Sequence, residues 1–191
     1  NLAGDTRHVY QELWRFGGGL ASGIRIWRLR AGFRGFYCLC SVCFRDVCEV
    51  FRHGFRALKP GGWLEMQDTC FPCYSADGSA DGTALQMWFE KLIEGGVRLG
   101  RPFGTEPPNY AMYMERMGFE DIHVEVKQWP FGPWHEDKKM KELGLWSRAN
   151  ALDGAEAVSM AVLTRGLGWS TEQVEALLVE VRKDLMNPDI H

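Results

Sequence analysis

The sequence lacks any long apolar run, which excludes a helix that spans a membrane. The longest such run, residues 36–44, is far shorter than the roughly 18 residues that a span requires. The sequence also lacks a secretory signal, and it opens on Asn rather than Met, as a processed protein or a fragment does. We therefore expect an intracellular protein, cytoplasmic or nuclear, without a membrane partner.

Lys and Pro are missing from the first 58 residues, although these are rich in Arg, Gly, Trp and Cys. Residues 1–60 carry nine Arg and one Lys against four acidic residues, a net charge of +6, whereas 61–191 carry −9. A basic arm that binds an anionic partner usually mixes Lys with Arg, and the whole chain has a net charge of −3, so we expect no nucleic-acid partner. The composition is also typical of translated GC-rich non-coding sequence. We therefore predict that 1–44 is an atypical or poorly ordered segment, separate from a domain over 45–191.

The six cysteines form a second possible constellation. Cys40 and Cys43 make one C-x-x-C pair, Cys70 and Cys73 another, and four thiolates are able to hold zinc tetrahedrally. However, the 26 residues between the pairs exceed the usual separation of such ligands. We favour ordinary small thiols and no metal, with zinc as the alternative.

Residues 45–68 predict a helix, a tight turn and a strand. Apolar residues recur at helical spacing over 45–58, and Pro60 prevents the helix from continuing. Gly61 and Gly62 allow the chain to reverse tightly. The following strand, 63–67, ends in polar Gln67 and Asp68, and a loop is expected from there to Asp81.

The remainder reads as helices with one further strand. A helix begins at Thr83, with Leu85, Trp88, Phe89, Leu92 and Val97 on one face, and a short helix follows from Asn109 to Met117. Over 119–129 the residues alternate, with Ile122, Val124 and Val126 on one side, which predicts a strand exposed on its other face. Asp137 is expected to cap a helix that runs to about Leu152, with Leu143 and Trp146 facing inward. Another helix is expected over 155–167. Ser170 and Gln173 form a capping-box pattern at the start of the last helix.

Several of these segments, in this order, resemble one family. They are FRALKPGGWLEMQD (55–68), DGTALQMWFEKL (81–92), MERMGFEDIHVEV (114–126), GPWHEDKKMKELGLW (132–146) and AVLTRGLGWSTEQVEALLVEVRKDL (161–185). From residue 45 onward the chain is similar to fungal class I S-adenosylmethionine-dependent methyltransferases related to global regulators of secondary metabolism.

This resemblance implies an α/β, Rossmann-like class I methyltransferase fold whose later strands are 63–67 and 121–129. It also implies a helical insertion over the cleft at 82–117 and a helical C-terminal tail at 137–186. The fold is expected to be incomplete at its N-terminal, cofactor-binding half.

The family holds S-adenosylmethionine in a glycine-rich loop after its first strand. The glycine cluster of this chain includes Gly17 and Gly19, which are the candidate cofactor residues. It follows Glu12–Phe16, which lacks the β-branched run of a buried strand, and too little chain separates it from residue 45 for the intervening elements. We therefore predict that S-adenosylmethionine binding by this chain is weak or absent.

Methyl transfer requires little acid–base chemistry from the protein, so the sequence assigns no catalytic residue. The site mainly holds the acceptor in line with the methyl group and excludes water. Ligands of open α/β sheets lie beyond the carboxyl ends of the strands. The candidates for the substrate pocket are Gln67 and Asp68 at a strand end, Met87 and Trp88 on the insertion helix, and Trp134 after Gly-Pro.

The sequence thus predicts a methyltransferase-like protein of fungal secondary metabolism that acts on a small-molecule or protein acceptor if it is active. The alternative is a non-catalytic interaction module, whose helices over 82–100 and 137–186 pack on a protein partner such as another methyltransferase-like subunit or a second copy. An open sheet edge left by a missing half favours such pairing.

Overall fold

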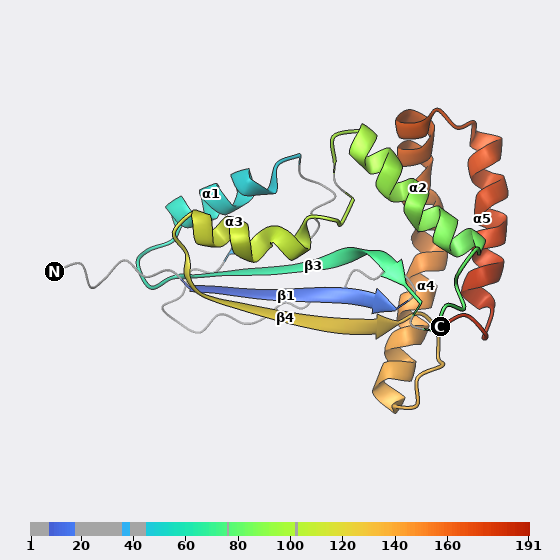
Figure 1. The fold of residues 1–191 in the computed structure, drawn as a ribbon, viewed down its shortest axis with the longest axis horizontal. Helices are drawn as coiled ribbons and strands as arrows, with labels where there is room; N and C mark the ends of the chain where they lie inside the picture. Colours follow the sequence, from blue (N-terminus) through green and yellow to red (C-terminus); the bar gives the residue numbers. More distant parts are fainter. Residues whose placement is uncertain (1–7, 18–35, 39–44, 76, 102) are drawn as a thin grey trace.

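The structure is a computed structural model that describes residues 8–17, 36–38, 45–75, 77–101 and 103–191. Its described strands form a parallel sheet in the order β2-β3-β1-β4. The strands are β1 (His8–Gly17), β2 (Phe36–Cys38), β3 (Trp63–Tyr74) and β4 (Glu120–Pro130). Figure 1 shows that β1, β3 and β4 all point toward a layer of helices at one end of the molecule.

The predicted helix, turn and strand over 45–68 are confirmed. Helix α1 (Val47–Ala57) begins where the Asp46 carboxylate accepts a hydrogen bond from the backbone N–H of Cys48 at 2.8 Å. The turn after it places Gly61 at a φ of +75°, which glycine adopts without steric cost. At Gly62 a Cβ atom would lie 2.8 Å from the Lys59 carbonyl oxygen, so both glycines are needed for the tight return into β3.

Two helices cover one face of the sheet (Figure 1). They are α1 and α3 (Tyr110–Arg116), the latter preceded by a 3-10 turn, η2 (Pro107–Asn109). The rings of Phe51 and Tyr110 meet edge to face with centroids 5.0 Å apart, and both are fully buried. The core on this face consists of Val47, Phe51, Leu58, Leu64, Met66, Tyr110, Met114 and Phe119.

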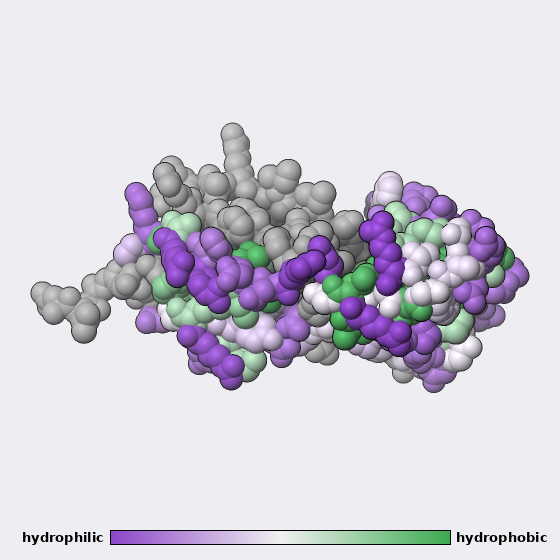
Figure 2. Space-filling view, turned by 90° about the horizontal axis from the view of Figure 1, so that it is seen from above, coloured by the Kyte–Doolittle hydropathy of each residue, from purple (hydrophilic) through white to green (hydrophobic). Residues whose placement is uncertain are grey.

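The helices at the strand tips form a second core. They are α2 (Ala84–Arg98), α4 (Lys138–Ala161) and α5 (Thr171–Met186), with a π-helical turn, η3 (Val162–Gly166), after α4. The helix predicted to begin at Thr83 is confirmed, with Thr83 as its N-cap, and the predicted capping box of Ser170 with Gln173 is complete. Seen from above, hydrophobic side chains appear between the part that contains the sheet and this helical part (Figure 2).

Glu12–Phe16 lack the β-branched run expected of a buried strand, yet they lie within a strand. Residues 8–17 form β1, which pairs in parallel with β3 on one side and with β4 on the other. Hydrogen bonding to two neighbours outweighs the missing β-branched residues, because strand propensity depends strongly on context. The rest of 1–44, apart from β2, lies outside the described residues, so the division at residue 44 stays a prediction.

The expected loop over 68–81 was also wrong in its first half, because β3 continues to Tyr74. Polar Gln67 and Asp68 suggested a strand end, yet each is only 4% exposed and the register with β1 runs past them. The polar side chains are tolerated inside because they form hydrogen bonds with other side chains.

The helices predicted over 137–152 and 155–167 are one continuous helix, α4, that leads into η3. Gly154 does not interrupt it, since a single glycine costs a helix only about 1 kcal/mol. Trp146 was expected to face inward but is 69% exposed. Val97, Val124 and Val126, also expected on buried faces, are about half exposed, although Ile122 packs against the α1–α3 core.

Two glycines of α4 give the first prediction. A Cβ atom at Gly144 would lie 2.0 Å from the carbonyl oxygen of Gly132, in the turn between β4 and α4, whereas nothing lies within 4 Å of one at Gly154. We expect Gly144→Ala to lower the free energy of unfolding by roughly 2 kcal/mol or more. The control Gly154→Ala should raise it by about 0.5–1 kcal/mol. Urea unfolding of both variants checks this, and equal effects would contradict the close approach.

Candidate functional site

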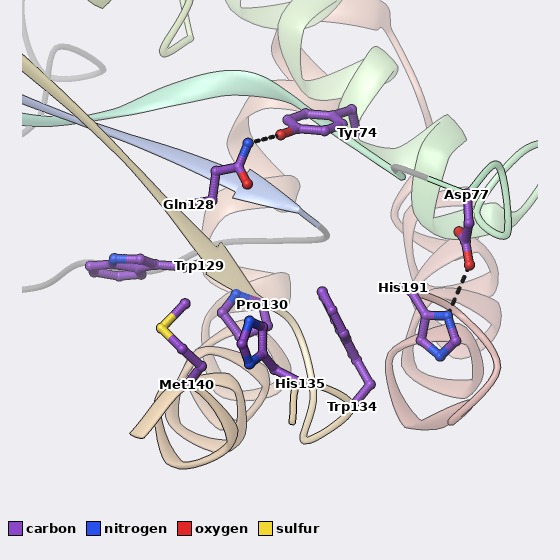
Figure 3. A pocket seen from close by; sticks show the side chains of 9 residues that line it. All are labelled: Tyr74, Asp77, Gln128, Trp129, Pro130, Trp134, His135, Met140 and His191. Atoms are coloured by element: carbon purple, nitrogen blue, oxygen red, sulfur yellow. Dashed lines mark hydrogen bonds and ion pairs between the residues drawn. The ribbon is translucent and has the colours of Figure 1, made fainter. Parts of the chain in front are cut away.

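A pocket of about 280 Å³ lies beyond the carboxyl ends of β3 and β4 (Figure 3). It is lined by Tyr74, Asp77, Gln128, Trp129, Pro130, Trp134, His135, Met140 and His191. Because ligands of open α/β sheets bind beyond the carboxyl ends of the strands, this pocket is the candidate site.

The sheet positions the inner wall of the pocket. Tyr74 ends β3, and Gln128 lies near the end of β4, with the end of β1 between them in the sheet order. The side-chain amide of Gln128 donates a hydrogen bond to the Tyr74 hydroxyl, which joins the two strand ends (Figure 3). Gly17, the last residue of β1, pairs in register with both Tyr74 and Pro130.

The turn into α4 positions the outer wall. Asp137 caps α4 by accepting hydrogen bonds from the backbone N–H groups of Lys139 and Met140 at 2.9 and 3.0 Å. The backbone N–H of Asp137 in turn donates to Nδ1 of His135 at 3.0 Å. Since Nδ1 is an acceptor there, neutral His135 carries its proton on Nε2. These contacts hold the segment that presents Trp134, whose ring is 40% exposed.

Asp77 provides a negative charge at the rim. Its carboxylate accepts hydrogen bonds from the backbone N–H of Ser79 at 3.0 Å and from the Ser75 hydroxyl at 2.7 Å. It also lies 2.9 Å from Nδ1 of His191, the last residue of the chain. Hydrogen bonds from Ser79, His191 and Ser75 hold the pKa of Asp77 well below its ordinary value, so the group is ionised at neutral pH.

His191 closes this side of the pocket. Its backbone N–H donates to the Ser79 hydroxyl at 2.7 Å, and its ring lies 5.5 Å from that of Trp134, centroid to centroid. The ring of His135 flanks Trp134 at 5.8 Å. The pocket therefore depends on residues from four parts of the chain that only the fold brings together.

Of the predicted pocket residues, Trp134 lies in this pocket. Gln67 and Asp68 lie inside β3 rather than at its end: Gln67 donates to the Glu65 carboxylate at 2.7 Å, and Asp68 accepts from the Tyr110 hydroxyl at 2.8 Å. Their contact with a substrate stays a prediction, but their placement at a strand end was wrong.

The two predicted residues of the insertion helix point in different directions. Trp88 is fully buried among α2, α4 and α5, and its Nε1–H donates to the Ser159 hydroxyl at 2.7 Å. Met87 is 42% exposed and lines a separate groove of about 340 Å³ between α2 and α5, together with Trp169 and Gln173. The five predicted residues therefore do not converge on one cavity.

Most of the pocket was missed for one reason. Because the predicted strand 63–67 ends seven residues before β3 does, Tyr74 and Asp77 were expected in the loop that follows it. Trp129 and Pro130 did mark the end of the second predicted strand, and this signal was available. Nothing in the sequence indicated that His191 returns to the same place.

The alternative zinc site receives no support from the described part of the chain. Cys40 and Cys43 lie outside the described residues, and Cys70 is buried with its Sγ 3.8 Å from the Phe71 carbonyl oxygen. Among the described residues no three metal-ligating side chains gather. The four-thiolate site stays a prediction.

For the cofactor that the family uses, the described residues provide one backbone position. Gly17 lies at the carboxyl end of a central strand, as a cofactor loop would, and Gly19 lies outside the described residues. The residues that follow β2 lie outside the described part of the chain, so no ribose-binding side chain is assigned there. The described residues therefore do not complete a cofactor site.

In the described chain no helix has the length and apolar character to cross a membrane.

Comparison with known proteins confirms the predicted resemblance: about three-quarters of the chain is homologous to fungal methyltransferases, a family that includes regulators of secondary metabolism. It is 37% identical over 147 residues to the probable methyltransferase tdiE of Emericella nidulans, covering 76% of this chain and 46% of that protein. It is 32% identical over 148 residues to methyltransferase pytC of Aspergillus terreus, covering 77% of this chain and 45% of that protein. It is 30% identical over 143 residues to the secondary metabolism regulator laeA of Monascus pilosus, covering 75% of this chain and 39% of that protein.

The chain thus spans less than half the length of these curated relatives. No family model matches it, and no solved structure does. A Rossmann-like fold is what the homologues imply, and the parallel sheet with helices agrees with it.

The buried hydrogen bond to Asp68 gives the second prediction. Tyr110→Phe removes the hydroxyl that donates to this carboxylate, so we expect the free energy of unfolding to fall by about 1–3 kcal/mol. In the control Tyr113→Phe, the lost hydroxyl donates to the carboxylate of Glu106, which is only half-buried. The free energy of unfolding should therefore fall by less than about 1 kcal/mol. Chemical unfolding followed by fluorescence measures both, and a costlier Tyr113→Phe would refute the structural role of Asp68.

Proposed function

We propose that this chain is the acceptor-binding part of an S-adenosylmethionine-dependent methyltransferase of fungal secondary metabolism. One observation supports this above all: the segment homologous to methyltransferases forms an aromatic pocket beyond the carboxyl ends of β3 and β4. The relatives' names supply the reaction class, and the pocket supplies a place for the acceptor.

The residues of the chain contribute binding and orientation. The cofactor, when bound, supplies an activated methyl group, so the protein mainly has to hold the acceptor in line and exclude water. Trp129 and Pro130 form a buried wall that excludes water, and the more exposed Trp134 covers the mouth. The backbone N–H of Asp137 occupies Nδ1 of His135, which leaves Nε2 of this ring for orienting an oxygen of the acceptor.

The division of the chain is part of the proposal. We propose that residues 82–117 form an insertion over the cleft, that 137–186 form a helical tail, and that 1–44 are a separate N-terminal segment. The tail contributes Met140 to the pocket. The described residues offer Gly17 and no side chain for the cofactor, so we propose that this chain binds S-adenosylmethionine weakly.

The third prediction tests the reaction and the cofactor together. Titration calorimetry with S-adenosylmethionine should give a Kd weaker than about 100 μM. At about 1 mM labelled cofactor, the chain should methylate a component of the small-molecule fraction of a fungal extract. Trp134→Ala should abolish the transfer, and Trp146→Ala, on the exposed side of α4, should leave it unchanged.

Different outcomes separate the parts of this proposal. A micromolar Kd for S-adenosylmethionine would refute the proposal that the cofactor binds weakly, but it would agree with the proposal that the chain is a methyltransferase. A folded chain that transfers no methyl group at saturating cofactor would overturn the enzyme and leave the interaction module.

That second candidate is favoured by exposed apolar side chains. Trp146 and Leu145 lie on the surface of α4, and Val124 and Val126 lie half exposed on β4. β4 is an edge strand of the described sheet, and an open edge with apolar side chains invites pairing with another chain.

The fourth prediction concerns this alternative. If β4 pairs with a second copy, sedimentation velocity at about 50 μM should show a dimer that Val126→Lys disperses, because a charge on an edge strand opposes pairing. Val97→Lys, a matched change at an exposed position of α2, should leave the dimer intact. A monomer at every concentration would remove self-pairing from consideration.

A further inference from the structure

The candidate pocket has a chemical character that goes beyond the reaction class. Its walls are mostly apolar and aromatic: Tyr74, Trp129, Pro130, Trp134 and Met140. Such walls favour a flat ring, because aromatic rings gain from stacked or edge-to-face contact beyond the burial of their area. The thioether of Met140 adds an adaptable contact to ring edges.

The pocket has one carboxylate, that of Asp77, which contacts Nδ1 of His191 at 2.9 Å. Among its lining residues Asp77 carries a full negative charge, and none is Lys or Arg. Lys138, Lys139 and Lys141 lie on α4 close to Met140 in sequence, but they are exposed and do not line the pocket. A carboxylate beside aromatic faces attracts cations and repels anions.

The size of the pocket sets a limit on the ligand. A volume of about 280 Å³ lies just below the range of roughly 300–1,000 Å³ that is usual for small-molecule sites. One or two fused rings fit this space, whereas an extended peptide or a dinucleotide-sized molecule does not.

We propose that this pocket takes a flat aromatic molecule of one or two fused rings that is neutral or cationic, and that it discriminates against anions. The statement rests on the proposed function for its role as the methyl acceptor, but the binding itself does not depend on methyl transfer. Trp134 provides the stacking surface and Asp77 the charge discrimination.

Three probes of one shape test the proposal on the purified chain without cofactor. They are 1-naphthylmethylammonium, 1-naphthalenemethanol and 1-naphthoate, and binding is measured by titration calorimetry at low salt. We expect the cationic and neutral probes to bind at least about fivefold more tightly than the anion. At 0.5 M NaCl the preference should shrink to less than about twofold, because salt screens an exposed carboxylate.

Matched variants assign the two roles. Trp134→Ala should raise the Kd of all three probes by about fivefold or more, whereas Trp146→Ala should leave the Kd values unchanged. Asp77→Asn should remove the preference against the anion, whereas Asp153→Asn, which changes the net charge equally at an exposed position of α4, should preserve it. The salt series reports on the charge even if Asp77→Asn disturbs the loop.

The outcomes are distinct from those of the proposed function. Equal or tighter binding of the anion, indifference to Trp134→Ala, or no binding of any probe by the folded chain would overturn the inference. Probe binding as expected without any methyl transfer would keep the aromatic site and overturn the enzyme.

Discussion

The parallel pairing of β1 with both β3 and β4 is the constraint on which the rest of this structure depends. β3 and β4 are far apart in sequence, and in the described sheet each pairs with β1 rather than with the other, so β1 sets their carboxyl ends at one edge. Backbone hydrogen bonds inside a sheet are costly to leave unmade, so the position of β1 between two partner strands is a strong constraint. The inner wall of the pocket, and the contact between Gln128 and Tyr74, follow from it.

The helical layer completes the site through close contacts rather than through long-range forces. Gly144 of α4 lies directly against the backbone of Gly132, so the turn that carries Trp134 has little freedom. The cap at Asp137 fixes the start of the same helix, and the contact of His191 with Asp77 ties the end of the chain to the end of β3. The rim is thus determined by packing and by local hydrogen bonds.

The homology and the geometry support different parts of the functional argument. The relatives name a methyl transfer, but this chain spans less than half of their length. The pocket proposed for the acceptor is small, at about 280 Å³, and mostly apolar. The candidate cofactor glycine lies next to it in register, at the end of the strand that organises the sheet.

The sequence by itself determined the local elements of this protein and its resemblance to fungal methyltransferases. The Lys-Pro-Gly-Gly turn, the helix start at Thr83, the caps at Asp137 and Ser170, and the ordered motifs were predictable, because capping, turn chemistry and periodicity act over a few residues. The tertiary structure alone decided that Asp68 is buried, that β1 is a central strand and that His191 reaches the pocket. These depend on partners far away in the chain: the Tyr110 hydroxyl for Asp68, two neighbouring strands for β1, and Asp77 for His191. Local sequence patterns carry no information on such partners, because the free energy of a buried polar group or an unusual strand is set by what surrounds it.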